Sequence, residues 1–251
     1  MSSWSQRRKL IYISVVGIIP LIAVIILAFN FFYKAPTCSD GIRNGDELGI
    51  DCGGACVRLC ATSFLTPHVA WTRLERVAPG LYNVAAYIIN PNPTVSARHV
   101  PYHMIVYDDQ GIEITEYTGT VTLPSHRNTL AFSGAVNMGK RIPAKALFEF
   151  TQAPEWHVDT DPLAAISIGN KNYSEDQSGA SLSVTLKNNG IDAVGTTDVY
   201  VVLYDKDGNA LGFSKTILDA IPVYGSTVAP FTWPNSFGGA VISTEVLPVA
   251  E

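Results

Sequence analysis

The sequence has few of the motifs that enzymes concentrate in a catalytic site. Only 16% of its 251 residues are charged, and its five histidines are scattered. No Gly-x-Ser-x-Gly nucleophile elbow, phosphate-cradling loop or Rossmann glycine triplet occurs in it. These absences argue against serine-elbow hydrolases and against nucleotide-dependent enzymes, so we predict no catalytic residue and no cofactor.

Clusters of basic residues are also absent after the first nine residues. Without Arg7, Arg8 and Lys9, 14 of the 17 cationic residues remain against 22 acidic ones, a balance of −8. Proteins that bind nucleic acid neutralise phosphates with cations, and anionic lipid attracts polybasic segments. The rest of the chain therefore argues against a nucleic-acid partner and against adhesion to anionic lipid.

One long apolar run lies near the start of the chain. From Leu10 to Tyr33 no side chain ionises except the phenols of Tyr12 and Tyr33. At about 1.5 Å per residue, a helix of this length reaches roughly 36 Å, enough to cross a hydrocarbon core of about 30 Å. Pro20 should kink such a helix without ending it. We therefore expect residues 10–33 to form a transmembrane helix in contact with lipid.

A cleaved signal peptide is the alternative for this run. Signal peptides have a shorter apolar stretch, about 7–15 residues, and a small-x-small cleavage site. Here the run is longer and ends in an aromatic edge that suits a membrane interface, made of Phe29, Phe31, Phe32 and Tyr33. An uncleaved anchor is the better interpretation.

The charges beside the run predict its orientation. Arg7, Arg8 and Lys9 precede it, whereas Lys34 stands alone after it. Positive residues stay on the cytoplasmic side. We expect residues 1–9 to be cytoplasmic and everything from Lys34 onward to be extracytoplasmic, in a single-pass protein of the cell membrane.

All four cysteines fall within 23 residues after the run, at Cys38, Cys52, Cys56 and Cys60. On the oxidising side of a membrane an even count in so short a segment indicates two disulfides, which replace the core that the segment is too small to form. Three pairings are possible. A zinc site with four thiolates is the alternative, but the spacing fits it only in part. Residues 34–61 form what we call the Cys-rich neck.

Acidic residues and glycines fill the neck between the cysteines. Oxygen ligands at this density make a weak calcium candidate, although Asp, Asn and Gly are also ordinary residues of turns. The candidate ligands are Asp40, Asn44, Asp46, Glu47 and Asp51. We predict no other metal site.

The neck sequence Cys38-x-Asp-Gly-x-x-Asn-Gly-Asp-Glu-x-Gly-x-Asp-Cys-Gly-Gly-x-Cys56 resembles a short cysteine-rich module of bacterial surface and secreted proteins. The resemblance covers about twenty residues. It implies extracellular placement and no particular activity.

Beyond Cys60 the sequence repeats itself. Several landmarks recur in one order at an offset of 97 or 98: Tyr107-Asp-Asp-Gln-Gly111 as Tyr204-Asp-Lys-Asp-Gly208, Pro124 as Pro222, and Thr129 as Thr227. Such a constant offset predicts an internal duplication, with units at residues 62–158 and 159–251. The linker between them is short, so we expect the two units to pack as a semi-rigid rod.

Within each unit the apolar residues alternate with polar ones. Leu182, Val184 and Leu186 point one way, and the residues between them point the other. No helical stripe follows residue 61. Six or seven short strands in roughly 95 residues predict a β-sandwich of immunoglobulin or fibronectin type. The expected fold class is an all-β ectodomain of two such tandem sandwiches after one transmembrane helix and a disulfide-rich neck.

Each unit also resembles the FxLYD and WHy-type families of small bacterial β-sandwiches. Their pattern is an apolar strand ending in Asn, a Tyr-Asp-x-x-Gly hairpin and a turn containing Pro. The matching residues are Asn90, Tyr107, Asp108, Gly111 and Pro124 in the first unit and Asn188, Tyr204, Asp205, Gly208 and Pro222 in the second. The resemblance implies this fold and a surface or envelope setting, with no catalytic residues.

Two further groups of side chains have a functional and a structural interpretation. His99 and His103 are four apart, but Pro101 argues against a helix, and on a strand they lie about 13 Å from each other, too far to share an ion. Trp71, Trp156 and Trp233 could form exposed binding platforms. Because large aromatic residues are mostly buried, we expect these tryptophans in the core.

Together these features predict a non-catalytic, membrane-anchored interaction or spacer protein. The alternative is an accessory subunit of a cell-envelope machine, for secretion or surface-appendage assembly, whose partner supplies the chemistry. The sequence identifies neither the ligand nor the protein partner.

Overall fold

The computed structural model describes residues 4–33, 35–60, 64–125, 127–158, 161–238 and 240–250. The domain boundaries predicted at residue 34, at residues 61–62 and at residue 159 lie outside these ranges. The chain divides into two compact units, Met1–Cys56 and Val57–Glu251.

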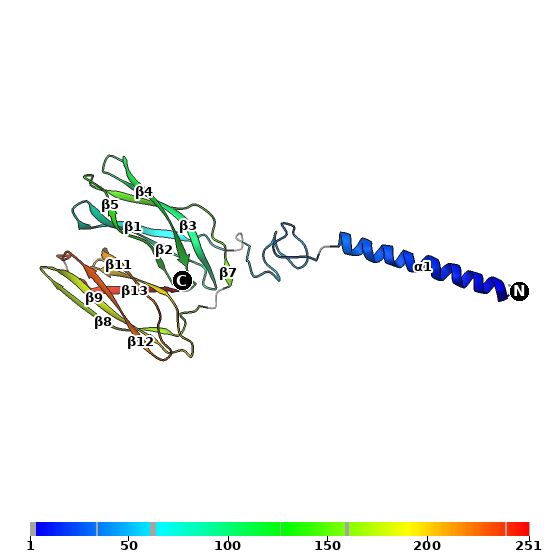
Figure 1. Ribbon diagram of the computed structural model, residues 1–251. Helices are drawn as coiled ribbons and strands as arrows, with labels where there is room; N and C mark the ends of the chain where they lie inside the picture. The colour runs from blue at the N-terminus through cyan, green and yellow to red at the C-terminus, as the bar shows by residue number, and fades with distance from the viewer. Residues whose placement is uncertain are drawn as a thin grey trace. The chain divides into compact units, whose positions relative to one another are not determined.

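The first unit begins with one long helix, α1 (Trp4–Phe32), drawn in blue in Figure 1. Within it, Gln6–Phe29 has a mean hydropathy of 3.0, and none of this segment is buried in the protein. The helix continues through Pro20, as expected. It is long and apolar enough to cross a membrane.

The first β-sandwich consists of two antiparallel sheets. One contains β1 (His68–Ala78), β2 (Leu81–Ile89) and β5 (Thr129–Asn137) in the order β1-β2-β5. The other contains β3 (Val95–Tyr107), β4 (Glu113–Leu123) and β6 (Lys145–Phe150) in the order β4-β3-β6, and the short β7 (His157–Val158) pairs with the start of β3.

The second β-sandwich has the same strand order. One sheet contains β8 (Ile166–Asp176), β9 (Gly179–Asn188) and β12 (Ser226–Trp233) in the order β12-β9-β8, and the other contains β10 (Thr197–Tyr204), β11 (Ala210–Leu218) and β13 (Ser243–Ala250) in the order β11-β10-β13. Its strands β8 to β13 begin 97, 98 or 102 residues after their topological counterparts β1 to β6.

Each sandwich has its own core between its two sheets. Alternate residues of every central strand point into it, and in β9 these are Leu182, Val184 and Leu186, all buried as predicted. Trp156 lies in the first core and Trp233 in the second, so both tryptophans are core residues.

A third core joins the two sandwiches. The outer face of sheet β1-β2-β5 packs against the outer face of sheet β11-β10-β13, so that Ala85, Tyr87 and Leu130 meet Tyr200, Val202, Phe213, Leu247 and Val249. Trp71 belongs to this contact, with its ring centroid 5.2 Å from that of Tyr87 and 6.2 Å from that of Phe213.

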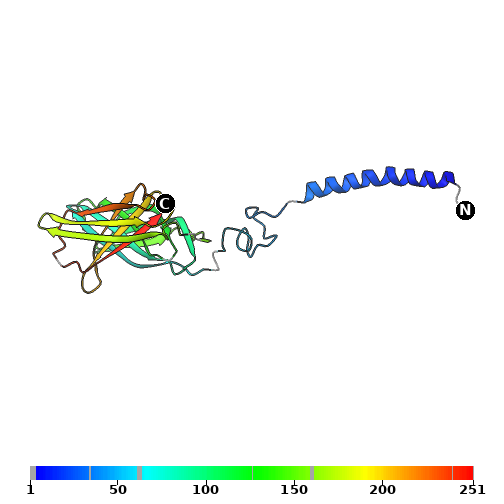
Figure 2. The same cartoon turned by 90° about the horizontal axis from the view of Figure 1, so that it is seen from below.

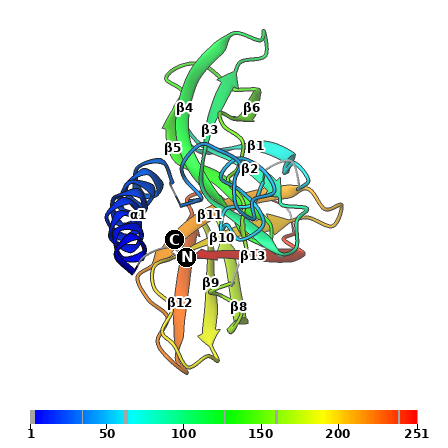
Figure 3. The ribbon, with the colours of Figure 1, turned by 90° about the vertical axis from the view of Figure 1, so that its right-hand side faces the viewer.

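The four sheets therefore lie in layers. Figures 1 and 3 show them in the order β4-β3-β6, β1-β2-β5, β11-β10-β13 and β12-β9-β8. From below, the yellow-green strands β8 and β9 lie nearest the viewer (Figure 2). The expectation of a rod is wrong in its geometry, because the sandwiches stack through sheet faces rather than end to end.

Asn90, which follows β2, and Asn188, at the end of β9, make hydrogen bonds to corresponding loops of the two sandwiches. Asn90 Nδ2 donates to the carbonyl oxygens of Val95 and Pro124 at 2.9 and 3.0 Å. Asn188 Nδ2 donates to those of Asp192 and Ile221 at 2.8 and 3.3 Å. Each Asn thus ties the end of its strand to the turn that contains Pro124 or Pro222.

The two Tyr-Asp hairpins are also built alike. Asp108 Oδ1 accepts hydrogen bonds from the backbone N–H groups of Gln110 and Ile112. Asp205 Oδ1 accepts them from the N–H groups of Asp207 and Asn209. These carboxylates cap a turn, which is the hairpin role predicted for both segments.

Replacing Asn188 with alanine should cost about 3 kcal/mol of the free energy of unfolding, because it removes the three hydrogen bonds of this side chain to the backbone of Gly190, Asp192 and Ile221. Asn188 is fully buried, whereas its neighbour Asn189 is exposed and provides the matched control. Urea denaturation of the full-length protein measures both variants. A loss for Asn188→Ala no larger than that for Asn189→Ala would contradict this role.

Candidate functional site

Disulfides hold the neck. Cys38 and Cys56 are joined, with their Cα atoms 5.7 Å apart. Cys52 and Cys60 are disulfide-bonded as well, and the described chain has no free cysteine. The neck therefore has covalent constraints where it has no core.

The carboxylates proposed as calcium ligands bind the neck's own backbone. Asp51 accepts the N–H of Gly41 at 2.9 Å, and Glu47 accepts the N–H groups of Asn44 and Asp51, both at 3.3 Å. Asp40 accepts the side-chain amide of Asn44 at 2.9 Å, a hydrogen bond that lowers the pKa of this carboxyl group. A cation would have to compete with these donors.

The remaining candidate ligands give no stronger indication of a metal. A Cβ atom on Gly54 would lie 1.6 Å from the backbone oxygen of Asp46, so the glycine is required for close packing here. Asn44 Oδ1 is buried and accepts no hydrogen bond within the described part of the chain. Calcium binding by the neck stays a prediction.

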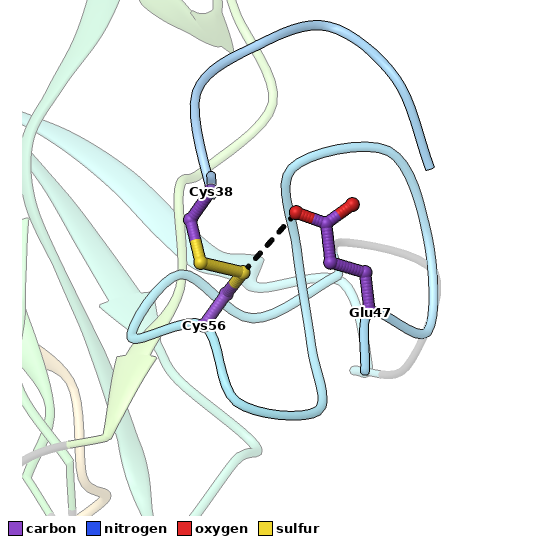
Figure 4. A group of neighbouring side chains, drawn as sticks. All are labelled: Cys38, Glu47 and Cys56. Carbon is purple, nitrogen blue, oxygen red and sulfur yellow. Dashed lines mark hydrogen bonds between the residues drawn. A yellow bond between two sulfur atoms is a disulfide. The ribbon is translucent and has the colours of Figure 1, made fainter. Parts of the chain in front are cut away.

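Figure 4 shows Glu47 beside the Cys38–Cys56 disulfide. Their potential ligand atoms lie within 4.8 Å of one another, and Glu47 Oε1 is 3.4 Å from Cys56 Sγ. Because metals bind thiolates and both sulfurs are in a disulfide bond, this group is a packing contact rather than a metal site.

The histidines of β3 occupy different environments. His99 adopts φ +51° in a bulge between Ala97 and Val100. His103 lies on the outer face of its sheet, with Nδ1 3.0 Å from Glu116 of β4 and Nε2 3.0 Å from Glu149 of β6. Hydrogen bonds to Glu149 and Glu116 raise the pKa of His103. Sequence reasoning missed this cluster, because its members lie 13 and 46 residues apart.

Partly buried polar groups line the contact between the two sandwiches, and the hydrogen bond from Tyr87 to Glu245 crosses it. The hydroxyl groups of Tyr87 and Tyr204 each donate to Glu245, both at 2.8 Å. Asn128 Nδ2 donates to the oxygen of the Tyr87 hydroxyl at 2.7 Å. A second carboxylate, Asp198, accepts the Tyr200 hydroxyl at 3.1 Å and pairs with Lys215. The third core therefore combines apolar packing with directional hydrogen bonds.

Glu75 of β1 is a carboxyl group partly enclosed by the same contact. Burial raises its pKa to about 7, against the opposing effect of two weak hydrogen bonds. These come from the N–H of Phe213 at 3.5 Å and from Asn83 Nδ2 at 3.4 Å. The group is costly to ionise in the folded protein.

Equivalent faces of the two sandwiches differ in chemistry. The buried residues Tyr200, Phe213 and Leu247 of the second sandwich occupy the positions of His103, Glu116 and Glu149 in the first, by strand register. Likewise, Ala85 and Tyr87 in the third core correspond to Ser183 and Thr185, which face outward from β9. For each pair of corresponding sheets, the outer face is therefore apolar and buried in one sandwich and polar in the other.

Comparisons with known proteins give no family. No protein-family profile matches this chain, and neither does any curated protein. Solved structures that align with it include a beta-galactosidase described from Bacteroides fragilis (12% identity, TM-score 0.21, 73% of this chain) and a beta-glucuronidase of glycoside hydrolase family 2 (11%, 0.21, 87%). The chain spans 35% and 29% of those structures, and a likeness at that TM-score carries no argument about activity.

The environment of Glu75 predicts a pH-dependent stability. The folded protein binds this proton more tightly than the unfolded chain, so stability falls as the pH rises from about 4.5 to about 7. Glu75→Gln should remove this dependence and stabilise the protein by about 2 kcal/mol at pH 8, with little change at pH 4.5. Denaturant unfolding over this pH range measures the effect.

Glu113→Gln is the control, because Glu113 is exposed at the start of β4. An equal stabilisation by both substitutions at pH 8 would show that Glu75 has no special environment.

Proposed function

We propose that the protein is a non-catalytic interaction module, anchored by a single membrane span, whose two immunoglobulin- or fibronectin-like sandwiches act as one block on the extracytoplasmic side. The apolar α1, the three cations in its first two turns and the disulfides of the neck support the anchor and the compartment. The observation that carries the proposal is the third core between the sandwiches.

That core favours binding over simple spacing. Domains joined by a linker alone move relative to one another, whereas an apolar contact fixes their geometry. Here the hydroxyl group of Tyr87 in the first sandwich also donates a hydrogen bond to Glu245 in the second. A fixed block presents its outer sheet faces and loops in one arrangement, which lowers the entropic cost of binding a partner.

The titratable clusters have structural roles that agree with this proposal. His103 bridges three strands through Glu116 and Glu149, and Asp108 and Asp205 cap hairpins. Each of these groups is engaged in holding the fold. The alternative, an accessory subunit of a secretion or appendage-assembly machine, differs from this proposal only in that the partner is bound permanently.

Protease treatment of intact cells and of inverted membrane vesicles tests the compartment. We expect the protease to release fragments of residues 57–251 from cells stripped of their outer layers. In inverted vesicles these residues should be protected from the protease. Digestion only in the inverted vesicles would overturn the proposal.

Crosslinking with mass spectrometry on the same cells tests the interaction. We expect crosslinks from the β-sandwiches to an envelope protein, at a fixed set of positions. Turnover of an envelope substrate by the purified full-length protein, lost on replacement of one of its acidic or histidine residues, would overturn the non-catalytic assignment.

A further inference from the structure

One end of the first sandwich combines apolar and cationic surface. There the segment after Cys56 pairs with β7, as Arg58 faces His157 across a β-bridge and the N–H of Leu59 donates to the carbonyl of Trp156 at 3.0 Å. β7 in turn pairs with the start of β3. The chain thus enters the β body at this end.

The apolar part is a hollow of about 240 Å³ with exposed side chains beside it. Its walls are formed mainly by Phe64, Leu65, Pro67, Phe150, Pro154 and Trp156. Leu65 is 65% exposed, and so is Val158 of β7, while Val57 is 80% exposed. Apolar side chains gathered in this way mark interaction or membrane surfaces.

The cationic part is an adjoining hollow of about 380 Å³, which shares the loop of residues 152–154 with the first. Arg98, His99, His157 and Glu155 line it. Glu155 is paired with Arg58 at 2.9 Å, so its charge is already compensated. His99 adopts the left-handed backbone conformation noted above, a strain that proteins often retain at binding sites.

We propose that this end docks on the membrane, with Arg98 and the flanking histidines binding the phosphate of an anionic phospholipid and with Val57, Leu65 and Val158 entering the interface. The inference rests on the membrane anchoring proposed above. Val57 directly follows Met1–Cys56, the unit that carries α1, so the tether holds this end at a high effective concentration near the bilayer. Cations beside apolar side chains match the two halves of a lipid.

The charge balance of −8, calculated for all residues after Lys9, gives no indication of this cationic surface. It counts every acidic residue equally, whereas two carboxylates at this end are paired with arginines, Glu155 with Arg58 and Asp161 with Arg127. Charges beyond about 8–10 Å are screened at physiological ionic strength, so the local balance decides adhesion. For this end of the molecule, our proposal therefore departs from the expectation drawn from total charge.

Hydrogen exchange of the full-length protein in nanodiscs tests the proposal. Discs are made of zwitterionic phospholipid alone or with one-third anionic phospholipid. We expect amides of residues 57–60, 64–67 and 152–158 to exchange about fivefold more slowly in the anionic discs. Arg98→Gln should remove most of this difference, because the exposed guanidinium supplies the attraction.

Two matched controls come from the turn between β5 and β6. Lys140→Gln removes an exposed cation there and should leave the protection unchanged. Leu65→Ser should weaken the protection in both kinds of disc, whereas Ile142→Ser, at a position that is 75% exposed, should not. Unchanged urea unfolding of Arg98→Gln and Leu65→Ser confirms that these variants fold.

Equal exchange in the two kinds of disc would overturn the proposal, and so would an equal loss of protection in Lys140→Gln. A third arm adds inorganic phosphate to the zwitterionic discs. If phosphate alone gave the same protection, the site would bind a free anion and the lipid assignment would be wrong. Both faces of a disc carry the same lipids, so the result is independent of the compartment tested in cells.

Discussion

The burial of the outer face of β1-β2-β5 against the outer face of β11-β10-β13 is the constraint on which the β body depends. It makes two of the four sheets interior on both sides. In β10 every residue from Thr197 to Leu203 is buried, and in β2 so is every residue from Val84 to Ile88. Sheets buried on both faces have near-continuous apolar strands, which explains these runs. The raised pKa of Glu75 has the same origin.

The contact joins unlike faces, and the two corresponding free faces differ from them in chemistry. A contact between two different faces can repeat indefinitely unless the free faces are made unsuitable. Sheet β4-β3-β6 of the first sandwich is the counterpart of β11-β10-β13, and its free face carries the His103 cluster in place of Tyr200, Phe213 and Leu247. Sheet β12-β9-β8 of the second sandwich is the counterpart of β1-β2-β5, and its free face carries serine and threonine in place of Ala85 and Tyr87. Docking a copy there would take charged and hydroxyl groups out of water, which is costly. These polar faces act like the capping repeats of solenoid proteins.

Local patterns in the sequence predicted the elements, and long-range contacts decided the rest. The alternating residues of β9 predicted a strand, because successive side chains of a strand point to opposite faces. The long apolar run of α1 predicted a membrane-spanning helix. The third core was missed, although Tyr200 and Val202 are apolar at the positions where an exposed face would be polar. The Glu116–His103–Glu149 cluster and the Cys38–Cys56 bridge join residues whose proximity depends on the folded chain. A short linker fits both stacking and a rod, so it could not decide between them.

Native-state hydrogen exchange in increasing urea tests the shared core most directly. If the sandwiches form one cooperative body, the most protected amides of β2 in the first and of β9 in the second should converge on one opening free energy and one dependence on urea. Exchange of β9 through an opening that leaves β2 fully protected would contradict the account, because it would show that each sandwich folds without the other.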